Sequence, residues 1–434
     1  MNIEININGQ PSNAAYIGWS PQPSTIRLTA AQATPVNVLL KSISGIATGS
    51  VVFLTARNSQ PVTSLPLTIP ADGTSINFYV AGQTASTGDQ DTIIVATDAA
   101  TGVEYGRTTL MVRIRKNANT LTINERDRFL SAMTKFNLSQ GTPNYTDFLI
   151  MHNNDANTEI HTTSRTPRCS FLAWHRAFIL DLERQLQKFD PSVSLPYWKF
   201  DEPAPNVFTA DFMGAARSTG SLMFNASNPL VNWTVEGKIG VIRKPIFNVQ
   251  TSSASDPQVG ALNESDTIAL GADYLTFSSS MEQNPHGAAH ESFSTGPITD
   301  ITKATQDPIF FLLHANVDRL WALWQHVNDR YDISDINTYP IQGAFIKGKG
   351  THKAGDYIDD TMWPWNGISS TTDPGSTRPP SAPGGQFPQT VFASTPSAKP
   401  VLWEMIDYQG YSAKTKPNGF DYDMIIFNDQ NVMV

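Results

Sequence analysis

Histidines are the residues of this sequence whose number and spacing point most clearly to chemistry. The chain of 434 residues contains eight of them, and six fall into two groups of three. The groups are His152, His161 and His175, then His286, His290 and His314. The other two, His326 and His352, lie outside both groups and are interpreted as ordinary histidines. Because neutral imidazole is a common metal ligand, each group could hold one metal ion.

The spacing within each group indicates how the imidazoles would meet. His286 and His290 are four residues apart, so on a helix they face the same way. His314 would join them from the next helix. The histidines of the first group, His152, His161 and His175, would come from two helices and the loop between them. His161 lies in a polar stretch of that loop, where a surface histidine is the alternative interpretation.

The composition restricts which metal could be bound. Cys169 is the only cysteine, so an internal disulfide and a thiolate metal cluster are excluded. Sites made only of nitrogen ligands favour copper or zinc. The absence of carboxylates at Glu-x-x-His spacing argues against a di-iron bundle. Copper suits a site that must change oxidation state without thiolate, whereas zinc-dependent hydrolysis stays open on spacing alone.

The stretch 307–321 predicts a buried helix that would carry His314. Asp307 is a favourable N-cap, and Pro308 suits the first helical position because its missing N–H costs nothing there. Apolar residues recur at helical spacing on both sides of the histidine. A buried imidazole needs partners for its ring nitrogens. His175 lies in a similar apolar face, so both histidines are expected to have bound partners.

Other helices would position the remaining histidines. Thr122 and Glu125 match a capping box that opens a helix ending near residue 136. Further helical segments that would carry histidines are expected at positions 142–152, 171–189 and 286–290. The stretch 203–280 is expected to be irregular. The stretch 401–427 is expected to be β-like and tied back to the core.

The first part of the chain has a different pattern. Residues 1–116 contain about seven short runs rich in Val, Ile and Thr, separated by turn residues. This alternation predicts an all-β, immunoglobulin-like sandwich. It contains no histidine, so we expect an accessory domain for binding, docking or covering a site, or one that only stabilises the chain. Residues 116–119 are a plausible linker, and 120–434 would form the second domain.

The overall composition excludes some classes of function. Hydrophobic residues make up 40% of the chain and charged residues 16%, which is ordinary for a globular protein. The net charge of −9 argues against a nucleic-acid partner or an anionic membrane surface. No stretch has the apolar length of a transmembrane helix, and no signal peptide is visible. We therefore expect a soluble protein, either cytoplasmic or exported.

Two stretches resemble the copper-binding motifs of a known family. Phe171-Leu172-Ala173-Trp174-His175-Arg176 resembles the first copper motif of the tyrosinase, catechol oxidase and mollusc haemocyanin family. The stretch 307–321 resembles the second motif, and residues 282–290 are similar to the region around its first two ligands. The resemblance extends over about residues 120–330. It implies a mainly α-helical type-3 copper domain, in which a helix bundle holds two copper ions per chain.

The resemblance also implies a role for each site residue. It places three histidines on each copper: His152, His161 and His175 on the first, and His286, His290 and His314 on the second. Glu282 matches a glutamate that holds a water near the substrate, and Phe310 matches an aromatic position above the second copper. Gly287 occupies the position after the first ligand of that copper. Asp318 would orient the ligands without binding copper itself.

The sequence departs from the family pattern at several positions. The family usually has its second ligand nine residues before the histidine of the Trp-His-Arg motif; here Thr166 occupies that position, and His161 lies further back. Glu159 stands where some members have a cysteine bonded to this ligand, so that thioether is not implied. Gly287 replaces an asparagine linked in some members to phenol deprotonation. This last departure weakens the case for monophenol hydroxylation without excluding it.

The function implied by the resemblance is copper-dependent oxidation of small phenols and catechols to o-quinones by dioxygen. Two alternatives stay open from the sequence. One is a haemocyanin-like oxygen carrier without turnover, and the other is a binding or adhesion protein stabilised by its metal. The sequence does not specify the natural phenol or the oligomeric state.

Overall fold

The computed structural model describes residues 1–43, 45, 48–141, 143–155, 161, 168–246, 260–343, 355–365, 400–412 and 417–427. These residues form two units. The sheet unit consists of Met1–Ile114 together with residues 419–427. The helical unit consists of the described residues from Arg115 to 418. The predicted boundary at 116–120 lies close to this division, whereas residues 419–427 pack with the sheets.

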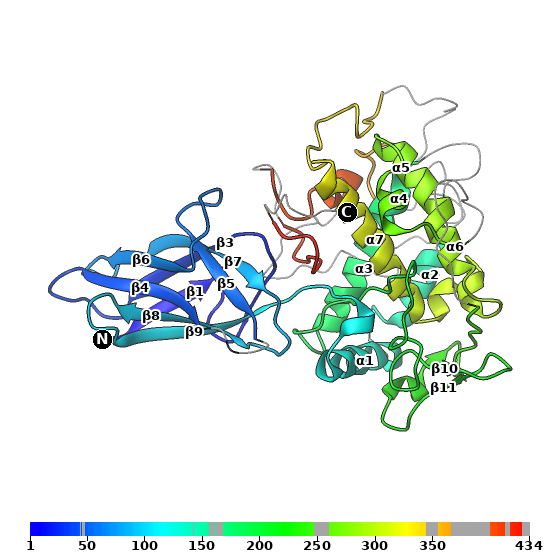
Figure 1. Ribbon diagram of the computed structural model, residues 1–434, viewed down its shortest axis with the longest axis horizontal. Coiled ribbons are helices and arrows are strands. Elements are labelled where there is room, and N and C mark those ends of the chain that lie inside the picture. Colours follow the sequence, from blue (N-terminus) through cyan, green and yellow to red (C-terminus); the bar gives the residue numbers. More distant parts are fainter. Residues whose placement is uncertain are drawn as a thin grey trace. The chain divides into compact units, whose positions relative to one another are not determined.

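Two β-sheets form the sheet unit (Figure 1). The strands are β1 (Ile3–Ile7), β2 (Ala15–Ile17), β3 (Gln22–Leu28), β4 (Val36–Ile43), β5 (Ser50–Leu54), β6 (Ser64–Ile69), β7 (Ile76–Thr84), β8 (Thr92–Asp98) and β9 (Glu104–Val112). One sheet has the order β1-β3-β7-β5 and the other β2-β9-β8-β4-β6. Among these described strands, the pair of β2 and β9 is the only parallel one. Buried and less buried residues alternate along β1 and β3, as the period of two requires.

Two strands of the sheet unit were not predicted. β2 has three residues, which is too short for an alternating pattern to be recognised. β6 contains Pro66, which argues against a strand in the middle of a sheet. The structure places β6 at the edge of its sheet, where a missing N–H is tolerated.

Residues 419–427 pack against the strands of the sheet unit. The backbone N–H of Trp19 donates to Asp421 Oδ2 at 2.8 Å, and its indole Nε1–H donates to the carbonyl of Tyr422 at 2.8 Å. A Cβ atom at Gly18 would clash with the Asp421 carboxylate, so glycine permits this close approach. Phe427 also packs against the core shared by the two sheets.

The prediction of β structure over 401–427 is wrong for the described residues of this segment. They contain η8 (Leu402–Met405), a 3₁₀ helix, and no named strand. Side chains of the helical unit bind the carbonyl groups that a strand would need for pairing: Arg176 binds that of Met405, and Gln325 binds that of Ile406. The segment is therefore tied to the core by side-chain and isolated backbone hydrogen bonds rather than by a sheet.

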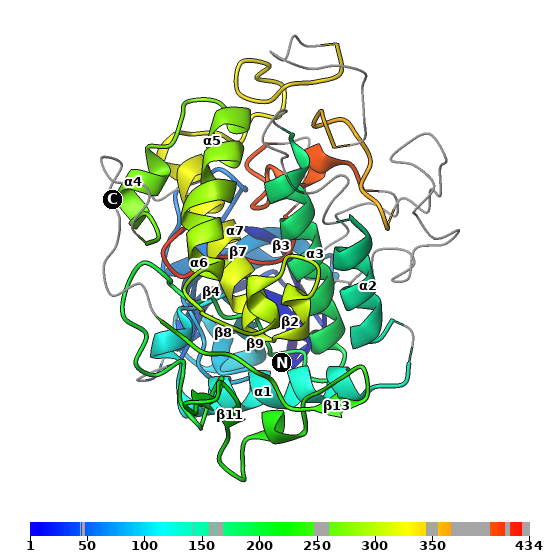
Figure 2. The same ribbon diagram turned by 90° about the vertical axis from the view of Figure 1, so that its right-hand side faces the viewer.

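Helices dominate the other unit, and several lie around α3 and α7 (Figure 2). They are α1 (Ile123–Leu138), α2 (Tyr145–Asp155), α3 (Ser170–Gln187), α4 (Glu264–Ile268), α5 (Tyr274–Met281), η4 (Glu282–Gly287), α6 (Ala288–His290) and α7 (Ile309–Val327). Short 3₁₀ helices are η1 (Ala118–Thr120), η3 (Pro229–Asn232), η5 (Pro297–Thr299) and η6 (Ala304–Gln306). Two small hairpins are β10 (Ala215–Ala216) with β11 (Leu222–Met223), and β12 (Thr234–Val235) with β13 (Lys238–Ile239). Every residue of α3 except the last is buried.

The predicted helix starts are partly right. The capping box of Thr122 and Glu125 is confirmed at the start of α1. The prediction of Asp307 as an N-cap is wrong, because the cap of α7 is Pro308 and the helix begins at Ile309. The Asp307 carboxylate instead forms a buried ion pair with Arg243. It also accepts a hydrogen bond from the Ile309 N–H at 3.1 Å.

The prediction that 203–280 is irregular is wrong at its end, where α4 and α5 lie. Asn263 caps α4 and Asp273 caps α5 with their side chains. Both helices are short, so their apolar residues complete at most two turns and give little periodicity. Within the described residues, no helix combines the length and the apolar character needed to cross a bilayer.

Candidate metal centre

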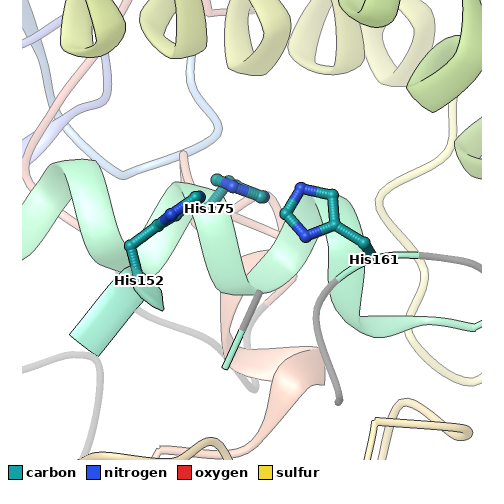
Figure 3. Close-up of side chains that lie close together, drawn as sticks. All are labelled: His152, His161 and His175. Atoms are coloured by element: carbon teal, nitrogen blue, oxygen red, sulfur yellow. The ribbon is translucent and has the colours of Figure 1, made fainter. Parts of the chain in front are cut away.

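The structure brings the first three predicted histidines together. His152 lies on α2 and His175 on α3, while His161 lies between these helices in the sequence. One ring nitrogen from each lies within 4.8 Å of the others. Figure 3 shows the three rings turned toward one another, with His152 and His161 approaching from opposite sides of His175. This is the first triad.

The second triad forms in the same way from a different part of the chain. His286 lies on η4, His290 ends α6, and His314 lies near the middle of α7. One ring nitrogen from each again lies within 4.8 Å of the others. Asn284 leaves helical geometry two residues before His286, whereas the predicted piece at 286–290 is helical, formed by the end of η4 and by α6. The two histidines still face a common point.

The two triads are adjacent. The rings of His175 and His314, one from each triad, stack with centroids 4.1 Å apart and an interplanar angle of 14°. His161 and His286 also lie face to face, with centroids 6.2 Å apart. α3 packs against α7, which places the rings of His175 and His314 side by side. Two ions held by the triads would therefore be close neighbours.

Hydrogen bonds orient several of these rings. The Nδ1 atoms of His175, His286 and His290 lie 2.8, 2.9 and 2.7 Å from the carbonyl oxygens of Phe171, Glu282 and Ile298. Since a carbonyl only accepts, each Nδ1 must carry the proton, and each Nε2 then presents a lone pair. A partner of this kind fixes a metal-binding imidazole in the required tautomer.

Other ring nitrogens are buried and have no hydrogen-bond partner within the described part of the chain. They are Nε2 of His175 and both ring nitrogens of His152 and His314. A buried polar atom without a hydrogen bond is destabilising. A metal ion bound to each triad would give one nitrogen of each of these rings a partner, so the residues present fit two metal ions.

Burial keeps these imidazoles neutral. It lowers the pKa of His290 to about 4. It also lowers the pKa values of His152, His175, His286 and His314 well below 6.5, and neighbouring imidazoles lower them further. Neutral imidazole is the form that binds metals. The site is therefore ready for a metal at neutral pH without losing protons first.

A cavity of about 320 Å³ lies beside the histidines. Its walls include the three residues for which we predicted catalytic roles, Glu282, Gly287 and Phe310. Phe310 is fully buried, and its ring centroid lies 4.1 Å from that of His314 and 4.9 Å from that of His152. The cavity could admit a small aromatic molecule to the triads.

Comparisons with known proteins agree with this geometry. Residues 142–327 match the family model described as the common central domain of tyrosinase. A tyrosinase from Streptomyces antibioticus is 30% identical over 274 residues, covering 58% of this chain and 93% of that protein. A tyrosinase from Streptomyces glaucescens is also 30% identical, over 277 residues, covering 59% of this chain and 93% of that protein. The chain belongs to the tyrosinase family.

The tyrosinase family uses two copper ions and oxidises phenols with dioxygen, and the two triads could hold those ions. The chain is therefore an enzyme of the tyrosinase or polyphenol oxidase kind, with copper-dependent phenol oxidation as its general activity. Among solved structures, a tyrosinase from Burkholderia thailandensis is similar, with 16% identity and a TM-score of 0.40. The match covers 68% of this chain and 77% of that one.

Asp318 belongs to a buried network of charges in this tyrosinase-family chain. Its carboxylate binds the guanidinium groups of Arg176 and Arg115, the latter at 3.0 Å. Arg115 also pairs with Glu183 at 2.6 Å. Arg176 follows His175 in α3 and lies over the Trp321 ring at 3.6 Å. The network connects α3 to α7 behind the stacked histidines.

Sequence reasoning missed three residues of this region. Arg115 and Glu183 were not assigned any role, because their pairing depends on contacts between distant parts of the chain. Glu291, which also lines the cavity, was missed as well. Its position directly after His290 was the one signal that could have drawn attention to it.

The other histidines and the departures from the family pattern are placed as follows. His326 lies at the end of α7 outside both triads, with its Nδ1 3.4 Å from the Tyr331 hydroxyl. His352, Thr166 and Glu159 lie outside the described residues. Cys169 is buried before α3, and its carbonyl accepts a hydrogen bond from Tyr274.

Proposed function

We propose that this enzyme oxidises o-diphenols to o-quinones with dioxygen, and that the six histidines of the triads are its copper ligands. The observation that carries the proposal is the pairing of the triads, in which several buried ring nitrogens have no hydrogen-bond partner among the described residues. In the overall reaction, two catechols each lose two electrons and two protons. One dioxygen molecule accepts all of these and becomes two waters.

The copper pair, when bound, supplies the redox chemistry with dioxygen. The protein supplies the surroundings of the phenol. We assign Phe310 and Ile298 as the apolar walls that receive the ring, because both are fully buried and line the cavity. Such walls also exclude water from the reacting groups.

We assign Glu282 as the residue that accepts the phenolic proton, through a water that it would hold. This residue is only 9% exposed and lines the cavity beside the second triad. Gly287 leaves this part of the wall without a side chain. We propose that Asp318 acts as a positioning residue, because it holds the arginine that follows His175.

We also propose that the sheet unit is an immunoglobulin-like accessory domain and that residues 120–434 contain all of the copper chemistry. Two sheets that share one apolar core support the first part. Both triads and the cavity lie within the helical unit, which supports the second part.

Monophenol hydroxylation and oxygen carriage use the same ligands and are the competing assignments. An oxygen carrier would bind dioxygen but would not oxidise a simple catechol. Gly287 lies at the cavity in place of a polar side chain. This favours oxidation of a catechol over removal of the proton from a monophenol.

The proposed function can be tested by metal replacement. Purified protein would be stripped of metal and reloaded with copper or with zinc. It would then be assayed on a monophenol and on the corresponding catechol, with the bound metal counted in the same samples. We expect catechol oxidation only with two coppers per chain. Turnover with zinc, or binding of one metal per chain, would contradict the proposal.

A further inference from the structure

A second, larger hollow adjoins the cavity beside the histidines. The first has a volume of about 320 Å³ and the second about 700 Å³. Gly287 and Glu291 line both, so the two hollows meet at these residues. A cavity of about 150 Å³ already holds a benzene molecule. The smaller hollow therefore has room for a phenolic ring, and the larger one has room for the group that the ring carries.

The walls of the two hollows differ in polarity. Apart from its histidines, its two glutamates and Thr299, the smaller hollow is lined by apolar residues such as Ile298, Ala304 and Phe310. The larger hollow contains several polar side chains, including Ser279, Ser280, Gln283 and Asn284. A ligand with an apolar ring and a polar tail would match this difference between the two hollows.

The carboxylate of Glu291 lies where the two hollows adjoin. Glu291 is exposed, and among the described residues its carboxylate has no hydrogen bond or ion pair. Glu282 adds a second carboxylate to the smaller hollow. The described lining of both hollows contains no lysine or arginine. Lys303, which is close to the lining in sequence, pairs with Asp300 at 3.0 Å.

We propose that Glu291 makes this enzyme selective for phenols and catechols whose side chain, opposite the reacting oxygens, ends in a protonated amine. The inference rests on the proposed function, because it requires the ring oxygens to face the triads. A substituent on the other side of the ring then points toward the junction of the hollows. There the Glu291 carboxylate attracts an ammonium group and repels a carboxylate.

The size of the selectivity follows from Coulomb's law near a protein surface. A pair of unit charges a few ångströms apart, partly screened by water, changes the relative affinity by about tenfold. The tail charge is the same in the substrate and in the transition state. It therefore changes binding of both equally, and the effect belongs in KM rather than in kcat.

The test uses three catechols that differ only in the end of an ethyl side chain. They are 4-(2-aminoethyl)catechol, 4-(2-hydroxyethyl)catechol and 4-(2-carboxyethyl)catechol. We expect the copper-loaded wild type to give about tenfold higher kcat/KM for the amine than for the carboxylate, mainly through KM. High salt should reduce this ratio.

Variants separate the proposed role from general effects of charge. Glu291→Gln should lower the amine-to-carboxylate ratio by about tenfold, and Glu291→Lys should reverse the order. Glu236→Gln is the matched control, because Glu236 is exposed and lines neither hollow. An unchanged ratio in Glu291→Gln, or an equal change in Glu236→Gln, would overturn the inference. If none of the three catechols is oxidised by copper-loaded protein, the proposed function itself fails.

Discussion

The sheet unit and the helical unit bury different kinds of side chain. The shared core of the two sheets consists of aliphatic and aromatic residues such as Ile26, Val38 and Phe53. The helical unit buries imidazoles and a network of charges at its centre. A hydrocarbon core is stable by itself, whereas buried charges and imidazoles are stable only with their partners. We therefore expect the helical unit to depend on individual residues and on bound metal much more than the sheet unit does.

The largest effect on stability is expected from Asp318→Asn. This change leaves the buried guanidinium groups of Arg115 and Arg176 without their shared carboxylate. Breaking a buried ion pair costs about 3–5 kcal/mol of unfolding free energy. Chemical denaturation of the copper-free protein would measure the loss.

Glu104→Gln is the control for this prediction in the sheet unit. Glu104 pairs with Arg107 on the surface, so its replacement should change stability little. If Asp318→Asn were as harmless as Glu104→Gln, the dependence of the helical unit on its buried charges would be refuted.

The next effect concerns pH. Burial lowers the pKa of His290 to about 4, against about 6.5 in the unfolded chain. Between pH 6.5 and 4 the unfolded state therefore binds the proton and the folded state does not, so stability falls as the pH falls. This histidine alone would lower the unfolding free energy of copper-free protein by on the order of 3 kcal/mol at pH 4.

Denaturation of copper-free protein at several pH values would measure this loss, with His290→Gln as the control. The variant should lose less stability between pH 6.5 and 4 than the wild type. An equal loss in both proteins would show that His290 does not contribute.

A smaller effect is expected in the sheet unit from Trp19→Phe. The change removes the hydrogen bond from the indole to the carbonyl of Tyr422, which is worth about 1 kcal/mol. Hydrogen exchange should be faster in β7, whose Gly82 N–H is bonded to the carbonyl of Gly18. Bound copper and turnover should be unchanged. Loss of copper in this variant would contradict the separation of the two units.

The smallest effect is expected from Gly287→Ala. The backbone of Gly287 is helical, with φ −56° and ψ −46°, and an added Cβ would lie 3.5 Å from its nearest neighbour, the carbonyl oxygen of Glu282. The variant should therefore fold and bind copper. We expect kcat/KM to fall several-fold for catechols with a long side chain and to stay nearly constant for catechol itself. Equal losses for both substrates would show that Gly287 does not border the path of the side chain.

The comparison of the units also explains what the sequence could predict. In the sheet unit, alternation of apolar and polar residues indicated most strands, because each strand buries one face. β2 and β6 were missed because one is very short and the other contains Pro66. In the helical unit, long helices such as α3 and α7 were predictable from their apolar spacing, whereas the short helices α4 and α5 were not.

The candidate site also has features that the sequence predicted and features that it did not. The grouping of the histidines was visible in the sequence, since His286 and His290 lie one helical turn apart. The partners of these groups were not visible, because they come from distant parts of the chain. Examples are the Ile298 carbonyl that orients His290 and the ion pair of Arg115 with Glu183. Local patterns reveal ligands, but tertiary contacts decide how the ligands are held.

The most direct test of the account is a copper count combined with a catechol assay on two histidine variants. His314→Ala removes a member of the second triad, and His326→Ala removes a histidine of the same helix outside both triads. The account predicts two coppers and full turnover for the wild type and for His326→Ala. It predicts at most one copper and loss of turnover for His314→Ala. Two coppers and full turnover in His314→Ala would contradict it.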